Sequence, residues 1–386
     1  MNKPANIPAL LGICCFVSMA AMRACDTLLP ALAADFNVTL GQAARVIFVF
    51  AIAYGVLQLV FGALGDRLGK LRVIAWCALS CVIGNAMAFF SPDLDWLVAA
   101  RILSGACAAG VFPLALAWLG DNVPYAERQP ALARLVSAGV LGMLAGQWLS
   151  GIIAEWVGWR AVFLVMSVLF LAAGGALLRA QRRETGTPPP PQKTLQTLRE
   201  LLSSPACLWI LAVVGVEGAL AIGALAFIPS WLQGEYGVSL SVAGAIAACY
   251  GVGGFIYTRM ARVLLGRIGE SGLARLGGAA LFVGLTSFVS VPWLAWTPLA
   301  CLLAGFGFYG LHNTLQTHAT QMAPHARGSA MALFACLLFV GQSVGIVAAA
   351  WVADHLNAAT FYWGAGVGLL LLGLAVAQRG APRSAH

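Results

Sequence analysis

The sequence predicts an all-α membrane protein with twelve transmembrane helices in two pseudosymmetric six-helix bundles. Three observations support this fold class. The mean hydropathy is +0.87 and only 9% of the 386 residues are charged, a composition unlike that of soluble domains. The chain contains many continuous apolar runs of about 20 residues, the length that crosses a bilayer as a helix. Its two halves also match each other at an offset of about 200 residues.

The apolar runs are the elements of this prediction. Each run is continuous and does not alternate between apolar and polar residues, which excludes a transmembrane β-barrel. The expected spans are residues 7–30, 42–64, 72–91, 96–118, 132–154, 160–179, 206–230, 240–262, 272–291, 297–318, 327–352 and 358–377.

A proline-rich segment divides the chain near its middle. It contains the run Pro188–Pro191 and a short amphipathic stretch from Thr194 to Leu202. Consecutive prolines favour an extended spacer without a packed core. We therefore expect an N-terminal bundle over residues 1–179, a cytoplasmic linker over 180–205 and a C-terminal bundle over 206–386.

The internal repeat extends over several helices of each half. An offset kept over that distance implies two halves of the same topology, related by an axis along the membrane normal as in parallel transporter repeats. The matched positions are Asp35–Leu40 with Glu235–Leu240, Arg67–Gly69 with Arg267–Gly269, Gly105 and Gly110 with Gly305 and Gly310, Gly142 and Gly146 with Gly341 and Gly345, and Glu155 with Asp354.

Topology explains the net charge of +8 better than nucleic-acid binding does. With the N-terminus in the cytoplasm, the 22 Lys and Arg residues all lie on the cytoplasmic side, apart from Arg23, Arg45, Arg101 and Arg160 within or beside spans. The outer loops carry acidic residues instead. This distribution follows the positive-inside rule, so we expect both termini in the cytoplasm and the plasma membrane, the bacterial inner membrane, as the location.

The ten cysteines do not indicate disulfides or a metal site. All of them fall inside the expected spans, and the sequence has no CxxC pair. We interpret them as small apolar packing residues. No histidine pair has ligand spacing either, so we expect no metal and no cofactor.

Two ionisable residues in the first half lie inside expected spans. Asp26 lies about 6 Å below the outer end of the first span, and Arg101 about 7–8 Å below the start of the fourth, so both share one layer of the membrane. A charge there must be paired or face a wet cavity. The interpretation is a proton-coupling pair in which the charge of Asp26 depends on its distance from Arg101. The alternative is a static salt bridge, and Arg23, three residues before Asp26, competes as its partner.

The second half offers a deeper pair. Glu217 lies about 19–20 Å from the outer end of its span and His312 about 22 Å from the end of its own. With Asn313, Phe308 and Gln147 they are our candidates for the wall of a substrate cavity. The alternatives are a hydrogen-bonded packing histidine and packing aromatic residues.

The loop after the second span carries a motif built from Gly62, Asp66, Arg67, Gly69 and Lys70. Gly62 allows close helix packing, Asp66 can cap a helix or form an ion pair, and Gly69 permits a tight turn. We expect a cytoplasmic gate that affects the rate of alternation. The alternative is a simple basic turn beside the membrane.

The second half carries a degraded form of the gate motif. Gly266 replaces its acidic residue and Glu270 replaces its lysine. We therefore expect the second half to hold the cytoplasmic gate closed less strongly than the first half does.

These motifs resemble those of a known family. The stretch from Gly62 to Arg72 resembles the signature loop of the major facilitator superfamily. Arg101–Gly110, Asp26–Pro30 and Gly158–Phe163 are similar to motifs of its twelve-helix drug:proton antiporter branch. The resemblance implies the major facilitator fold, with helices 1, 4, 7 and 10 around a central cavity. One departure is Gly146-Gln147 in the fifth span, where that branch usually has Gly-Pro.

We therefore expect a proton-coupled secondary transporter that exports a small amphipathic or lipophilic compound by alternating access. The alternative on the same fold is a proton-coupled importer or an exporter of a metabolite or siderophore. A membrane sensor is disfavoured by the intact gate motif, and an enzyme by the lack of a paired nucleophile and base. The expected partners are a small-molecule substrate, the proton and the lipid bilayer, with no nucleic acid, and we expect a monomer.

Overall fold

The computed structural model describes residues 6–181, 194–323 and 327–379, and these are almost entirely helical. The run Pro188–Pro191 lies outside the described residues. The helices of the first half are α1 Ile7–Arg23, α2 Leu29–Phe36, α3 Leu40–Ala43, α4 Arg45–Leu68, α5 Lys70–Phe89, α6 Leu94–Ala108, α7 Phe112–Asn122, α8 Tyr125–Trp156 and α9 Trp159–Gln181.

The second half begins with a short helix that matches the expected amphipathic stretch. Its helices are α10 Thr194–Ser203, α11 Pro205–Glu217, the π-helix η1 Gly218–Ile222, α12 Gly223–Tyr236, α13 Leu240–Ser290, the 3₁₀ turn η2 Leu294–Trp296, α14 Thr297–Thr320, α15 Arg327–His355 and α16 Ala359–Arg379.

The described helices account for the twelve expected spans. Ten helical segments are long and apolar enough to cross a membrane, and α1 is a shorter apolar helix. Two expected spans are joined in α13, but Gly269, with φ 64° and ψ −178°, interrupts its helical path. Counting α1 and dividing α13 at Gly269 gives twelve crossings. The prediction of an all-α membrane protein is therefore confirmed.

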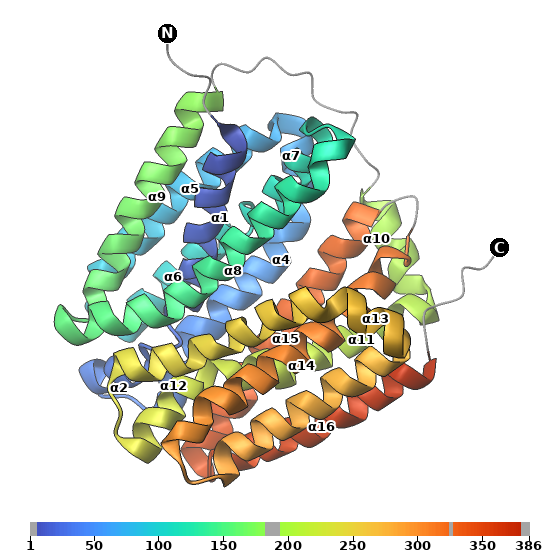
Figure 1. Cartoon of the computed structure of the whole chain (residues 1–386). Helices are drawn as coiled ribbons and strands as arrows, with labels where there is room; N and C mark the ends of the chain where they lie inside the picture. The colour runs from blue at the N-terminus through green and yellow to red at the C-terminus, as the bar shows by residue number, and fades with distance from the viewer. Residues whose placement is uncertain (1–5, 182–193, 324–326, 380–386) are drawn as a thin grey trace.

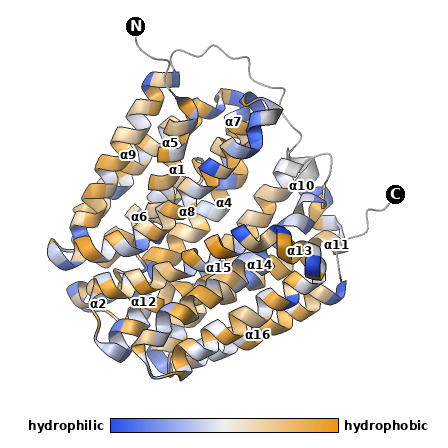
Figure 2. Ribbon diagram, in the orientation of Figure 1, coloured by the Kyte–Doolittle hydropathy of each residue, from blue (hydrophilic) through white to orange (hydrophobic). Residues whose placement is uncertain are grey.

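Hydropathy follows the layout expected of a protein in a bilayer. Figure 2 shows hydrophobic residues along the lengths of the helices, while hydrophilic residues gather mainly near the helix ends. Large apolar side chains such as Trp76, Ile83 and Val168 are exposed by 56%, 59% and 58%. Side chains of this kind are stable on a surface that faces lipid.

The internal repeat appears in the backbone conformation at equivalent positions. Left-handed residues follow α2 and α12, namely Asn37 at φ 53° and Gly237 at φ 62°. A hydroxyl then caps the next helix in both halves. The side chain of Thr39 accepts from the N–H of Gln42, and that of Ser239 accepts from the N–H of Val242.

Matched glycines also make matched helix contacts. Gly142 and Gly146 of α8 face α1, and Gly341 and Gly345 of α15 face α11 and η1. A Cβ atom at each of these positions would collide with the backbone of the facing helix. Small residues allow such close approach of transmembrane helices, so both halves use one packing device.

The two groups of helices meet at one end of the molecule. Figure 1 shows α1–α9 above and α10–α16 below, close together near α2 and α12 and diverging toward the chain ends. We call the end that holds α2, α3 and α12 the closed end, and the opposite end the termini end. Contacts between the halves run along α4 with α15 and along α8 with α13.

Candidate functional site

The first span of each half is interrupted inside the membrane layer. α1 ends at Arg23, and residues 24–28 form turns before α2 begins at Leu29. α11 ends at Glu217, and the π-helix η1 follows directly. Interrupted transmembrane helices are tolerated where protein or a water-filled cavity surrounds them, and single-turn π-helices are frequent at functional sites. Asp26 and Glu217 therefore lie at the two interruptions.

Asp26 is fully buried and has two partners in the N-terminal half. Its Oδ2 lies 2.6 Å from Nη2 of Arg23, and the Gln147 side-chain amide donates a hydrogen bond to the same oxygen at 3.3 Å. Oδ1 has no hydrogen-bond partner among the described residues.

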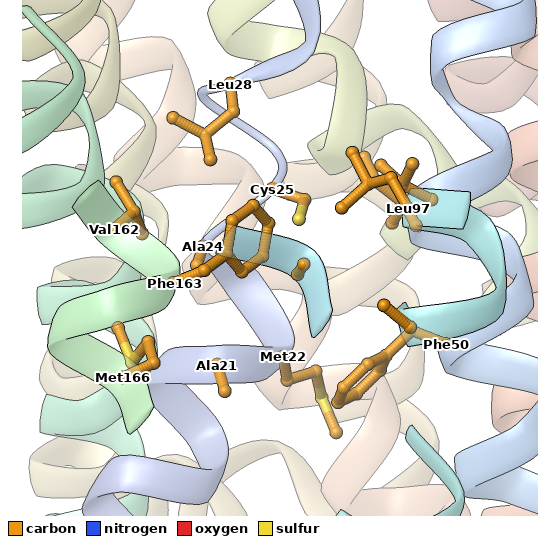
Figure 3. Close-up of a cluster of buried hydrophobic side chains, with 14 of the residues drawn as sticks. Ala21, Met22, Ala24, Cys25, Leu28, Phe50, Leu97, Val162, Phe163 and Met166 are labelled. Atoms are coloured by element: carbon orange, nitrogen blue, oxygen red, sulfur yellow. The ribbon is translucent and has the colours of Figure 1, made fainter. Parts of the chain in front are cut away.

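Close packing of α1 on α8 positions this group. The backbone of α1 approaches Gly142 and Gly146, and the hydroxyl of Thr27 donates to the carbonyl of Gln147 at 2.8 Å. Figure 3 shows the buried apolar side chains at the interruption, with Cys25 in the turn and Phe163 near it. The residue that departs from the family's Gly-Pro pattern is thus a direct partner of Asp26.

Arg101 does not pair with Asp26 in this structure. It donates to the carbonyls of Val46 and Ala21, each at 3.2 Å, and its guanidinium lies 4.1 Å from the centre of the Phe50 ring. Arg23, the competitor named from the sequence, is the partner of Asp26 in this conformation, and the coupling role of Asp26 with Arg101 stays a prediction. Arg23 takes the carboxylate because it lies one helical turn before it, whereas Arg101 ties α6 to α4 and α1.

Glu217 and His312 meet, as their predicted depths indicated. Nδ1 of His312 lies 2.9 Å from Oε2 of Glu217, whose side chain is completely buried, while that of His312 is 15% exposed. The ring of Phe308 stacks on His312 at 5.1 Å between centroids, and Phe334 lies at 5.5 Å. Two aromatic rings thus orient the imidazole toward the carboxylate.

The remaining cavity candidates lie close to these two pairs. Gln147 is buried against Asp26, and Phe308 is 8% exposed within the core of the second half. Asn313 is half-buried and its side chain interacts with the hydroxyl of Tyr257. Gln147 therefore contacts Asp26 directly, and Phe308 contacts the ring of His312. Whether all three contact a substrate stays a prediction.

The gate motif forms an ion-pair network at the termini end. Nζ of Lys70 lies 2.8 Å from a carboxylate oxygen of Asp66 and 2.8 Å from one of Asp121. Gly69, at φ 90°, makes the turn between α4 and α5. Arg67 is exposed. The network links α4, α5 and α7 within one half.

One part of the gate prediction is wrong in this conformation. Gly62 was expected to allow close packing, but a Cβ atom there would meet nothing within 4 Å. The glycine that makes the close contact is Gly65, which faces Leu114. Since the halves diverge at this end, Gly62 has no facing helix here.

The degraded motif of the second half makes a different ion pair. Glu270, at the position equivalent to Lys70, lies 3.2 Å from Nε2 of His318, whose side chain is 5% exposed. A single carboxylate–imidazole pair thus replaces the three-residue network of the first half.

Comparison with known proteins gives consistent relatives. A family model described as Major Facilitator Superfamily matches residues 11–346. A chloramphenicol resistance protein of Streptomyces lividans is 26% identical over 85% of this chain and 84% of its own length. The multi-drug resistance efflux pump PmrA of Streptococcus pneumoniae serotype 4 is 28% identical over 82% of this chain and 80% of its own.

Solved structures share the fold at low identity. A transporter of the POT family, PepTSo, superposes with a TM-score of 0.79 at 16% identity and covers 98% of both chains. A bacterial homologue of the human lysosomal transporter Spinster, in an inward-facing and unoccupied conformation, gives a TM-score of 0.74 at 15% identity and covers 98% of this chain and 96% of its own. The chain therefore belongs to the Major Facilitator Superfamily and is a multi-pass membrane transporter, not an enzyme.

Proposed function

We propose that this transporter exports a small amphipathic or lipophilic compound from the cytoplasm in exchange for protons. The observation that carries the proposal is the burial of Asp26 and Glu217 at the interruptions of the first span in each half. Ionisable groups at such depth mark ion and substrate pathways. The relative named as a multi-drug resistance efflux pump supports the proposed direction of transport.

In this proposal Asp26 carries the proton. Its partner Arg23 lies on α1 before the break, whereas Asp26 lies within the break. Bending at the break changes the distance between the two groups, and that distance sets the proton affinity of the carboxylate. Conformation and protonation are thereby coupled. Arg101 fixes the neighbouring turn of α1 through the Ala21 carbonyl, so it acts as the fixed point of this motion.

Glu217 and His312 form the proposed substrate contact of the second half. The side chain of His312 is 15% exposed, and its ring contacts those of Phe308 and Phe334, so aromatic rings lie next to a polar group. Mostly apolar walls with a few placed polar groups are typical of sites for small lipophilic ligands.

The charge distribution supports the proposed orientation in the membrane. Arg67, Lys70 and Arg72 lie together at the termini end, as do Arg259, Arg262 and Arg267 of the second half. By the positive-inside rule this end faces the cytoplasm. The bundles 1–179 and 206–386 are then in contact near the outside and apart near the cytoplasm, in the bacterial inner membrane. The proposed unit is a monomer.

An importer, or an exporter of a metabolite or siderophore, is the alternative on the same fold. Reconstitution into proteoliposomes with an imposed pH gradient of either sign separates export from import, and the choice of test compound separates the substrate classes. We expect lipophilic compounds to move against their own gradient only when protons flow in the opposite direction. Transport in the same direction as protons would overturn antiport, and transport without dependence on the gradient would overturn coupling.

A further inference from the structure

Two carboxylates at the closed end accept hydrogen bonds from the opposite half in a symmetric pattern. Each carboxylate lies in the last turns of one helix and meets the first turn of a helix in the other half. The acceptors are Asp354 of α15 and Glu155 of α8, which the internal repeat aligns with each other.

The first of these contacts joins α15 to α3. Asp354 accepts from the hydroxyl of Thr39 at 2.7 Å and from the N–H of Gly41 at 3.1 Å. Thr39 is the N-cap of α3, which begins the apolar span Leu40–Leu68, so the carboxylate meets the N-terminal end of that span, where anions are stabilised. A Cβ atom at Gly41 would collide with the same carboxylate, so glycine leaves the space that this contact needs.

The second contact joins α8 to α13. Glu155 accepts from the N–H of Ser241 at 3.2 Å, and the hydroxyl of Ser241 also interacts with this carboxylate. Ser241 lies in the first turn of α13, after the N-cap Ser239. Each half thus supplies one carboxylate and one helix N-terminus. Each carboxylate binds the helix N-terminus of the opposite half.

We propose that Glu155 and Asp354 form a two-part latch that holds the closed end shut. This inference rests on the proposed alternating access, because only that motion requires the latch to open. Both carboxylates must leave the facing helix N-termini when the halves separate at this end. The latch therefore favours the conformation seen here, and both parts break in the same step.

Distances between spin labels at the closed end test the latch directly. Phe90 and Trp293 lie on different halves at this end and are exposed by 75% and 71%. Replacing both with p-acetylphenylalanine allows labelling while the native cysteines stay in place. Double electron–electron resonance in lipid nanodiscs then gives the ratio of separated to closed molecules.

The latch variants have defined expected effects. Asp354→Ala and Glu155→Ala should each raise that ratio about fivefold, as for the loss of a typical side-chain helix cap, and the double variant about 25-fold, because independent free energies add. Gly41→Ala should act like Asp354→Ala while keeping the carboxylate. Each variant is measured separately. If one of them does not fold, the others still test the latch.

A matched control is available at the same end. Asp35 is also a partly exposed carboxylate there, but it pairs with Arg160 at 2.8 Å within the first half. Asp35→Ala should leave the distances unchanged. The latch is overturned if Asp354→Ala, Glu155→Ala and their double variant keep the wild-type ratio, or if Asp35→Ala shifts that ratio equally. Failure of the proposed function would appear separately, as absent pH-driven transport in the wild-type protein.

Discussion

Replacing Arg23 with Met tests the buried ion pair that defines the first interruption. Arg23 and Asp26 are 2.6 Å apart, with side-chain exposures of 4% and 0%. Removing one partner of a buried pair costs about 3–5 kcal/mol because it leaves an uncompensated charge. The Gln147 amide still donates to the carboxylate at 3.3 Å, so we expect a loss of stability near the lower bound, about 3 kcal/mol.

Two further variants show whether burial causes that loss. Arg160→Met breaks the Arg160–Asp35 pair, with exposures of 39% and 42%, and should cost less than about 1 kcal/mol. Arg23→Met combined with Asp26→Asn removes both buried charges and should recover most of the stability. Thermal unfolding in detergent, followed by tryptophan fluorescence, ranks the variants. The reasoning fails if Arg23→Met is no less stable than Arg160→Met, or if the double variant recovers nothing.

Three further predictions concern the second half and the gate. Glu217→Leu should weaken substrate binding about tenfold or more, the value of a charged hydrogen bond, whereas the half-exposed neighbour change Val216→Leu should not; equilibrium binding decides. Asp66→Asn should slow transport with unchanged binding, because its network lies away from the site; equal losses would place the loop in the site. Gly341→Val should lower the yield of folded protein by a collision with the facing helix, and Gly364→Val, which meets open space, should not.

The sequence predicted those features that depend on position along a helix. Depth counted from helix ends placed Glu217 and His312 in one layer, and the structure joins them at 2.9 Å. The same count placed Asp26 and Arg101 together, but it gives no direction around the helix. Arg101 points instead to the Ala21 and Val46 carbonyls.

For other features the sequence showed the residues but not their contacts. Gln147 stood out as a departure from the Gly-Pro pattern, and the structure shows that it contacts Asp26. Glu155 and Asp354 stood out as matched positions of the repeat, and the structure shows that both contact the opposite half. The interruption after Arg23 was not predicted, because residues 7–30 read as one apolar span with Arg23 and Asp26 as its charged residues. Gly62 was misjudged because its packing depends on how far apart the two halves are, which no local pattern contains.

Proton coupling through Asp26 is the central claim, and one flux measurement tests it. Wild type and Asp26→Asn are reconstituted side by side, and accumulation of a transported compound is followed under an imposed pH gradient. The amide resembles the protonated carboxylate in shape and lacks its charge. We predict that Asp26→Asn loses accumulation driven by the gradient while still exchanging substrate across the membrane. Accumulation at the wild-type rate in Asp26→Asn would contradict the claim and place the proton carrier elsewhere.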